Sequence, residues 1–186
     1  MSRSRVSERA RRAAVARASQ QRLVVAVLMA VVFGALGCVD ARAGDLRGKV
    51  TRVRDGDTIE IRRGGETIRV RVSGIDCPER GQPWSAKAKQ ATADLVGNRE
   101  VVVRVHDHDV YGRTVGEVLL PDGRNLGEEL VRQGLAWHYR HYSNDPTLAR
   151  LEAEARAAHR GLWIDPHPTP PWEYRHHGGG ATPATS

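Results

Sequence analysis

Asp55-Gly-Asp-Thr58 and Arg71-Val-Ser-Gly-Ile-Asp-Cys-Pro-Glu79 are the two stretches of sequence that decide the fold. Between them, apolar and polar residues alternate on either side of Gly64-Gly65, a pattern that predicts an antiparallel hairpin. Because a hairpin brings its two ends together, we expect three carboxylates and one arginine of these stretches to converge. Asp109-Val-Tyr-Gly-Arg113 adds a second arginine. Carboxylates beside guanidinium groups suit a hard cation and a phosphate ester, so the pattern predicts a metal-dependent phosphodiesterase.

Five short strand patterns and three helix patterns follow one another along the chain. Alternating apolar residues and turn residues predict strands at 48–53, 58–63, 67–73, 101–105 and 113–120. Helices are predicted at 85–95, 126–133 and 146–159, with Ser85, Asn125 and Asp145 as their N-terminal caps. One helix inserted among five strands, with two helices after them, fits a small closed barrel better than a parallel sheet.

The net charge of the whole chain, +7, is a poor guide to its partner. Residues 1–43 contain eight of the 29 basic residues and two of the 22 acidic residues. The remaining 21 basic and 20 acidic residues leave residues 44–186 nearly neutral. Affinity for a phosphate must therefore come from the local placement of arginines rather than from bulk charge.

Residues 1–43 have the pattern of a signal peptide. An arginine-rich stretch precedes residues 23–36, which are apolar or glycine and fall short of the ~20 residues that a membrane span needs. Ala41-Arg42-Ala43 predicts cleavage after Ala43, and the protein would then be secreted or remain in the periplasm or cell envelope. Two alternatives stay open, an uncut anchor through residues 23–36 and lipidation at Cys38. Cleavage would leave Cys77 as the single cysteine of the mature chain, without a disulfide.

These motifs together resemble the thermonuclease family, the staphylococcal-nuclease-like domains, over roughly residues 46–175. The resemblance rests on Asp55–Thr58, Arg71–Glu79, Tyr111-Gly-Arg113, Asn125-Leu126, Leu130-Val-Arg-Gln-Gly-Leu-Ala136, Gly161-Leu-Trp163 and Pro171-Trp-Glu-Tyr-Arg175. It implies an OB-fold, a five-stranded β-barrel with about three helices, whose ligand site lies on the barrel surface. It also implies calcium-dependent endonuclease cleavage of DNA or RNA that leaves 3′-phosphoryl ends. We therefore expect a nuclease domain at 44–175, followed by a disordered tail at 176–186.

The resemblance assigns roles to residues around the predicted cation. Asp57, Asp76 and the backbone carbonyl of Cys77 would bind Ca²⁺, which prefers six to eight oxygen ligands. Glu79 would act as the general base or orient the attacking water, since a carboxylate can accept its proton. Asp55 is interpreted as a turn residue only.

The resemblance also assigns residues to the substrate. Arg71 and Arg113 would bind the phosphate, whose extra negative charge in the transition state guanidinium groups can stabilise. Tyr111 would lie near the terminal phosphate, and Tyr142 would stack on a base. Val110 and Arg140 stand where the well-known secreted member has lysine and tyrosine, which leaves nucleotide affinity and base preference open. Trp137, Tyr139 and Trp163 are interpreted as packing residues.

Other functions remain compatible with this sequence. One is a catalytically silent module that binds nucleic acid or protein at the cell envelope, and another is a surface barrel for a different ligand. A silent module would have lost its acidic residues and arginines, whereas this chain has all five of the key residues, namely Asp57, Arg71, Asp76, Glu79 and Arg113. We expect a monomer that takes DNA and/or RNA as substrate, without a stable protein partner and without a membrane span in the mature chain.

Overall fold

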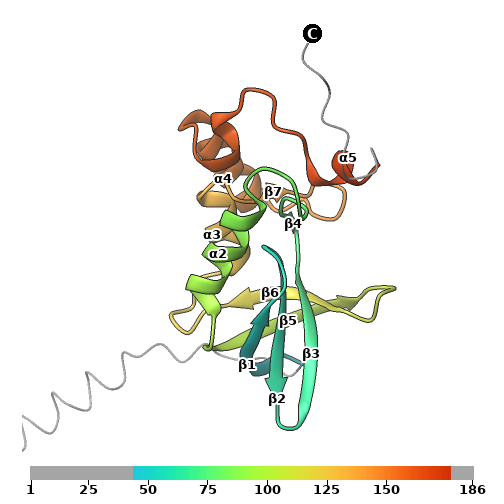
Figure 1. Cartoon of the computed structure of the whole chain (residues 1–186). Coiled ribbons are helices and arrows are strands. Elements are labelled where there is room, and N and C mark those ends of the chain that lie inside the picture. The colour runs from blue at the N-terminus through green and yellow to red at the C-terminus, as the bar shows by residue number, and fades with distance from the viewer. Residues whose placement is uncertain (1–43, 177–186) are drawn as a thin grey trace, which may run out of the picture. The chain divides into compact units, whose positions relative to one another are not determined.

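The computed structural model describes residues 44–176 and contains a closed five-stranded β-barrel (Figure 1). The predicted signal peptide (1–43) and all but the first residue of the predicted tail (176–186) lie outside the described residues. The barrel strands are β1 (Leu46–Val53), β2 (Thr58–Arg63), β3 (Glu66–Val72), β5 (Glu100–His108) and β6 (Thr114–Leu119). Each lies within a few residues of a predicted strand, and the predicted OB-type barrel is confirmed.

Antiparallel pairs join β1 to β2, β2 to β3, β5 to β6 and β1 to β5. The predicted hairpin around Gly64-Gly65 is confirmed by the pairing of β2 with β3. Asp55 forms the turn before β2, where its Oδ1 accepts the N–H of Asp57 at 3.2 Å. The barrel closes through a parallel pair of β3 and β6, in which Arg71 lies opposite Val115. This pairing brings together two segments that are more than forty residues apart. It places the end of β3 beside the start of β6.

Helices lie at one end of the barrel, in the upper part of Figure 1. They are α2 (Ser85–Val96), α3 (Leu126–Arg132), α4 (Pro146–Ala157), the 3₁₀ helix η1 (Gly161–Ile164) and the short α5 (Pro171–His176). Asn125 caps α3 by accepting the N–H groups of Gly127 and Glu128, and Asp145 caps α4, as predicted. The predicted cap Ser85 is wrong. Trp84 precedes α2 in a left-handed conformation (φ 72°) without a side-chain cap, and Ser85 is already helical.

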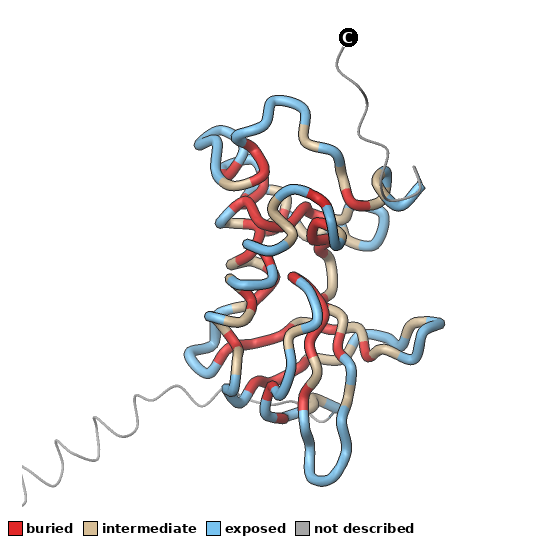
Figure 2. Tube along the Cα trace, viewed as in Figure 1, coloured by how far each residue is buried: buried red, intermediate tan, exposed pale blue. Residues whose placement is uncertain are grey.

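The core continues from the barrel interior into the helices, as the buried segments in Figure 2 show. Its fully buried side chains include Val50, Ile59 and Val70 of the barrel and Leu130 and Leu151 of the helices. Truncating a leucine of this kind to alanine typically costs about 2–5 kcal/mol of stability, because it leaves a cavity. A smaller cluster around two buried tryptophans packs beside this core.

A two-stranded sheet connects the barrel to the helical part. In it, β4 (Ile75–Asp76) pairs antiparallel with β7 (Trp137–His138), so that Asp76 lies opposite Trp137. The Gly74 carbonyl accepts the N–H of Tyr139 at 2.9 Å and extends this connection. The segment after β3 is thereby fixed to an aromatic segment some sixty residues later. Within residues 44–176, no helix is long and apolar enough to span a membrane.

Candidate active site

The site is built where β3 leaves the barrel. Arg71, near the end of β3, extends its guanidinium group between two buried aspartates. Its Nη2 donates to Asp76 Oδ1 at 2.8 Å, and its Nη1 lies 3.3 Å from Asp57 Oδ2. Nη1 also donates to the carbonyl oxygens of Val72 and Ile75, at 2.8 and 2.9 Å. The structure therefore brings together the two aspartates and the arginine that the sequence placed on separate loops.

The loop that carries Asp57 is held tightly between the barrel and α2. Asp57 Oδ2 accepts the N–H of Cys77 at 2.7 Å. The Thr92 hydroxyl, buried on α2, lies 2.5 Å from the Gly56 carbonyl oxygen. A Cβ atom at Gly56 would lie 2.7 Å from the Cys77 Sγ and 2.9 Å from the Ala88 Cβ. Only glycine allows the loop to approach this closely, and the approach sets the position of Asp57.

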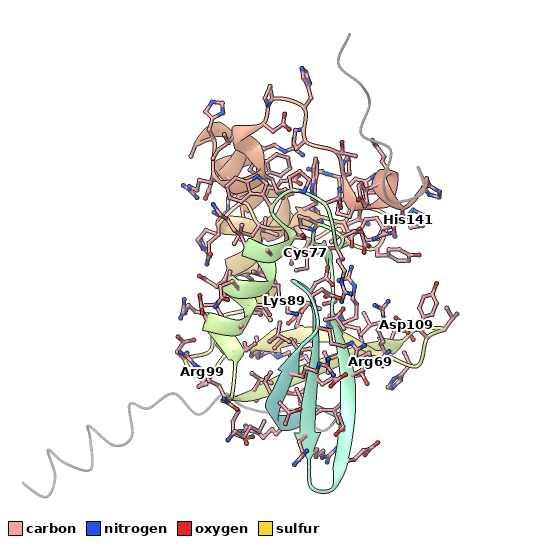
Figure 3. The ribbon with its side chains drawn as sticks, in the orientation of Figure 1. Arg69, Cys77, Lys89, Arg99, Asp109 and His141 are labelled. Atoms are coloured by element: carbon pink, nitrogen blue, oxygen red, sulfur yellow. The ribbon has the colours of Figure 1, made fainter. Side chains whose placement is uncertain are left out.

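Cys77, whose carbonyl is a predicted calcium ligand, has its thiol in the core. The residue is 4% exposed and lies where the barrel meets the helices (Figure 3). Burial, followed by the negative charge of nearby Asp57, raises the pKa of the Cys77 thiol well above its ordinary value. The side chain is therefore a small apolar packing residue, and the predicted role falls to its backbone carbonyl.

Glu79 lies on residues 77–84, which we call the Glu79 loop. Its backbone N–H donates to Gln82 Oε1 at 2.7 Å, and the Gln82 N–H donates to the Glu79 carbonyl at 2.9 Å. These reciprocal bonds close a tight turn. The Glu79 carboxylate itself is 40% exposed, so solvent water can reach it. It shares an arginine partner with Asp76, described below, and this places the two acidic residues on the same side of the site.

Arg113 directly precedes β6, the strand that pairs with β3 beside Arg71. Asp109 holds it in place, because Oδ2 accepts the Arg113 Nε–H at 2.6 Å and Oδ1 accepts the N–H groups of Tyr111 and Arg113 at 3.0 Å. The Arg113 guanidinium also lies 5.4 Å from the Tyr111 ring centre. Within residues 44–176, it contacts these two residues rather than the aspartates around Arg71. The structure thus places Arg113 directly before the adjacent strand, without joining it to the acidic cluster.

Arg175, on α5, is a site residue that sequence reasoning missed. Its Nη2 lies 2.9 Å from Asp76 Oδ2, and its Nη1 lies 2.5 Å from Glu79 Oε1. A 96-residue separation from Glu79 hides this contact from any local pattern. The available signal was the Pro171–Arg175 motif, in which an arginine follows tryptophan and tyrosine in a segment expected to wrap the surface.

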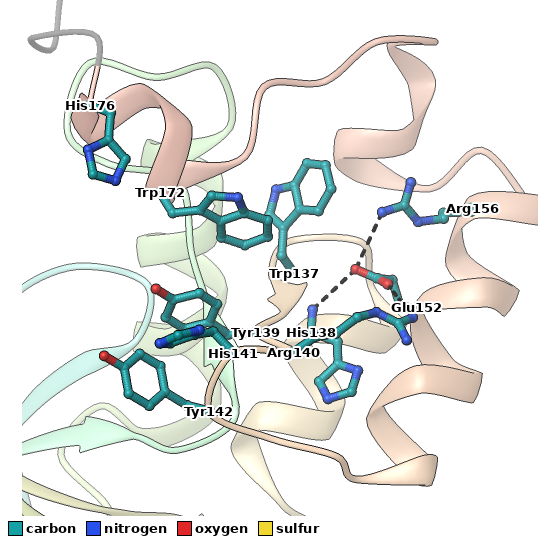
Figure 4. Close-up of a pocket in the computed structure, with 10 residues that line it drawn as sticks. All are labelled: Trp137, His138, Tyr139, Arg140, His141, Tyr142, Glu152, Arg156, Trp172 and His176. Carbon is teal, nitrogen blue, oxygen red and sulfur yellow. Dashed lines mark hydrogen bonds and ion pairs between the residues drawn. The ribbon is translucent and has the colours of Figure 1, made fainter.

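An aromatic pocket of about 550 Å³ (Figure 4) includes Trp137, which lies opposite Asp76 in the β4–β7 pair. It is lined by Trp137, His138, Tyr139, Arg140, His141, Tyr142, Glu152, Arg156, Trp172 and His176. Trp172 of α5 stacks on Tyr139 with ring centres 5.2 Å apart and planes 8° apart. Tyr142 is 73% exposed at the edge of the pocket, whereas Trp137 is buried, as predicted for a packing residue.

The remaining predicted positions are also located. Tyr111 is 76% exposed on the arm between β5 and β6, well placed for contact with a ligand from solvent. Trp163 is buried, as predicted. Arg140 pairs with Glu152 at 3.4 Å, and Glu152 is buried and also accepts the N–H of His138 at 3.2 Å. Where the well-known secreted member has tyrosine, this chain therefore has an arginine paired to an internal carboxylate.

Burial and charge act in opposite directions on the ionisable groups of the cluster. Burial raises the pKa of Asp76 above its ordinary value, although Arg175 and Arg71 favour its charged form. Burial opposes the charged form of Arg71, but the attraction of Asp57 and Asp76 is stronger in sum and raises its pKa. Likewise, hydrogen bonds to Asp76 and Glu79 outweigh desolvation and raise the pKa of Arg175. Both guanidinium groups are therefore charged at any pH at which the protein is folded.

The chemistry of the donor set fits a hard cation. Asp57, Asp76 and Glu79 bring three carboxylates against the two guanidinium groups of Arg71 and Arg175, which leaves an excess of negative charge. Carboxylate and carbonyl oxygens are the ligands that Ca²⁺ prefers. No group of three or more His, Cys, Asp or Glu side chains among residues 44–176 is arranged to hold a metal ion. A cation would therefore depend on the two aspartates together with a backbone carbonyl and water.

Comparison with known proteins gives matches along most of this chain. The profile of the family described as staphylococcal nuclease homologue matches residues 69–165. An uncharacterized endonuclease of Escherichia coli is 43% identical over 132 residues, which are 71% of this chain and 86% of the relative. A micrococcal nuclease of Shigella flexneri is 40% identical over 169 residues, which are 85% of this chain and 97% of the relative. Protein ParB of E. coli is 43% identical over 141 residues, 70% of this chain and 80% of the relative.

Proposed function

Because the chain belongs to the family of staphylococcal nuclease homologues, we propose that it is a calcium-dependent endonuclease of DNA or RNA that acts outside the cytoplasm. Family membership makes it a nuclease, an enzyme that hydrolyses phosphodiester bonds. The observation that carries the more specific proposal is the convergence of Asp57, Asp76 and Glu79 around the largely buried Arg71 side chain and the exposed Arg175.

Glu79 accepts the proton of the attacking water. The Glu79 carboxylate is accessible to solvent, and Arg175 pairs with both Glu79 and Asp76, which holds the two carboxylates close together. A water molecule near the aspartates is therefore within reach of Glu79. Proton transfer of this kind contributes about 10²–10⁴-fold to the rate of an enzyme. Attack then occurs in line with the leaving oxygen, which departs on the 5′ side and leaves a 3′-phosphoryl end.

Arg71 and Arg113 donate hydrogen bonds to the phosphate oxygens. Three of the five N–H groups of Arg71 are used by Val72, Ile75 and Asp76, so two remain for a phosphate. Arg113 uses Nε for Asp109, and both of its terminal nitrogens remain for a ligand. Guanidinium donors stabilise the transition state more than the ground state, because negative charge on the phosphate oxygens increases during attack.

Asp57 and Asp76, with the carbonyl of Cys77, are the residues that would hold Ca²⁺. A bound calcium ion supplies positive charge that neutralises a phosphate oxygen and favours ionisation of nearby water. What the chain itself contributes is the fixed spacing of the two carboxylates. Arg71 spans them, and the backbone N–H of Cys77 orients Asp57.

Export is supported by the signal-peptide pattern of residues 1–43, with cleavage after Ala43, and we propose a monomeric mature enzyme. Nucleic acid outside the cytoplasm would then be its substrate. An envelope-anchored form would perform the same chemistry.

The proposal is tested by incubating the purified chain with single- and double-stranded DNA and with RNA, in calcium, in magnesium and in chelator. We expect cleavage in calcium, loss of cleavage in chelator, and fragments with 3′-phosphoryl ends. Salt-dependent binding without cleavage would instead identify a silent nucleic-acid-binding module, because phosphate contacts weaken steeply with salt. Cleavage that continues in chelator would contradict the calcium requirement.

A further inference from the structure

The C-terminal segment of the described chain, residues 165–176, packs against the Glu79 loop, and we call it the C-terminal strap. One attachment runs through Gln82, which is buried within the Glu79 loop. Its side-chain nitrogen donates to the Thr169 carbonyl at 3.1 Å, while its side-chain oxygen accepts the Glu79 N–H. A single glutamine therefore connects the backbone of the strap to the backbone of Glu79.

A second attachment fixes α5 to the aromatic pocket (Figure 4). Trp172 stacks on Tyr139 and meets the edge of Trp137 with ring centres 5.6 Å apart. Pro171, at the start of α5, is buried. Aromatic contacts of this kind each add about 0.5–1.5 kcal/mol beyond the area they bury. The helix that carries Arg175 is thus anchored three residues before it, independently of the acidic cluster.

From this anchored helix, Arg175 reaches two carboxylates of the site at once. One terminal nitrogen contacts Asp76 and the other contacts Glu79, so the guanidinium group spans the pair. A planar fork sets the distance and orientation of its two partners more strictly than a lysine ammonium would. Two carboxylates placed side by side repel each other, and a glutamate on a half-exposed loop has several rotamers available. Arg175 opposes both effects.

We propose that Arg175 is a positioning residue for hydrolysis, which holds the Glu79 carboxylate beside Asp76. The proposal rests on the proposed function of Glu79 as the group that accepts a proton from water. It assigns to the C-terminal strap a part in the reaction, since the strap carries Arg175 into the site and fixes the Glu79 loop through Gln82. Arg175 acts through Glu79, because its Nη1 contacts the Glu79 carboxylate at 2.5 Å while its Nη2 contacts Asp76 at 2.9 Å.

The kinetic test compares Arg175→Met and Arg175→Lys with the unmodified chain, at saturating calcium and with single-stranded DNA. We expect Arg175→Met to lower kcat by about 10- to 100-fold with KM changed less than about threefold, because a displaced base affects the reaction more than binding. Arg175→Lys should recover part of kcat, since one ammonium can pair with one carboxylate. Arg150→Met is the matched control, as Arg150 also pairs with a glutamate, Glu154, at 2.6 Å, but on the exposed face of α4.

Two further measurements separate positioning from a structural effect. In a Glu79→Gln background, Arg175→Met should change kcat less than twofold, because the residue through which Arg175 acts is already lost. Hydrogen exchange of the peptide 77–84 should be about fivefold faster in Arg175→Met, while exchange in β1 and β2 stays unchanged. This second measurement requires no activity, and it reports on the contact even if the chain does not cleave DNA.

The outcomes are distinct. An unmodified chain that does not cleave DNA would contradict the proposed function, and exchange at 77–84 would then decide the positioning role alone. If the unmodified chain is active, an Arg175→Met variant with unchanged kcat would overturn the proposal. So would a rise in kcat/KM, which would make Arg175 an inhibitory contact. An equal loss in the Glu79→Gln background would overturn it too, because Arg175 would then act on another group.

Discussion

Substituting Gly56 by alanine tests how closely the Asp57 loop must approach the core. The added Cβ would lie 2.7 Å from the Cys77 Sγ and 2.9 Å from the Ala88 Cβ. Carbon atoms in contact prefer about 3.5–4.0 Å, so the loop must move by about 1 Å. Overpacking of this kind costs about 1–3 kcal/mol. For a chain of this size, that lowers Tm by roughly 2–12 °C.

The same movement should damage catalysis more than stability. A displacement of 1 Å in a reacting group can reduce the rate about 10²-fold, and Asp57 directly follows the substituted residue. We therefore expect kcat/KM of Gly56→Ala to fall about 100-fold while most of the protein stays folded at 25 °C. The measurements are thermal unfolding followed by circular dichroism and steady-state cleavage of DNA in calcium.

Gly65→Ala is the matched control for this prediction. Gly65 lies in the turn between β2 and β3, where an added Cβ meets no atom within 4 Å. We expect its Tm and kcat/KM to equal those of the unmodified chain, or Tm to rise slightly, since alanine restricts the unfolded chain. A Gly56→Ala variant with Tm within 1 °C and kcat/KM within twofold of the control would refute the close approach.

Three further predictions follow from the site. Asp109→Asn should lower the free energy of unfolding by about 1 kcal/mol at pH 7, through loss of the charge-assisted bond to Arg113. Although desolvation opposes the ionisation of Asp109, hydrogen bonds from Arg113 lower its pKa below the ordinary value. The stabilisation that the ionised Asp109 gives is therefore fully present above about pH 4, the pKa in the unfolded chain. It is lost as the pH falls through the lower pKa of the folded protein. Chemical unfolding at pH 7 and pH 3 should therefore show a smaller difference from the unmodified chain at pH 3. The Cys77 thiol should react with iodoacetamide at pH 8 at least 100-fold more slowly in the folded protein than in denaturant. The reason is that the thiol is buried and its pKa is raised. Peptide mass mapping measures the two rates of modification. Equal rates would show that the thiol is exposed. Tyr142→Ala should raise KM for single-stranded DNA with little change in kcat. The expected loss of binding free energy is about 1–3 kcal/mol, the contribution of an aromatic ring that stacks on a base. Ile164→Ala, which truncates another exposed apolar side chain, should leave KM unchanged.

Local patterns in the sequence predicted most of the barrel and two of the helix caps. Alternation over residues 58–63 and 67–73 reflects side chains that enter the core on one face only, so it defines strands directly. Asn125 and Asp145 cap their helices because short polar side chains accept the first free N–H groups. Ser85 was predicted by the same rule and was wrong, since Trp84 takes a left-handed conformation and the helix begins at Ser85, one residue earlier than a Ser85 cap would require.

Contacts between distant segments were beyond what local patterns contain. The parallel pairing of β3 with β6 depends on how the barrel closes, and no spacing in the chain indicates it. The acidic cluster was predicted by the two quoted stretches, but the way Arg71 spans both aspartates depends on three-dimensional packing. Arg175 was missed for the same reason, because its partners lie 96 and 99 residues earlier.

The measurement that tests the central claim most directly compares the cleavage of DNA in calcium by the unmodified chain, Glu79→Gln and Glu154→Gln. Both glutamates pair with an arginine and are about equally exposed, at 40% and 45%, but only Glu79 lies in the acidic cluster. The account predicts that Glu79→Gln lowers kcat at least about 100-fold with Tm nearly unchanged, and that Glu154→Gln has full activity. A Glu79→Gln variant with full kcat would contradict the assignment of the acidic cluster as the hydrolytic site.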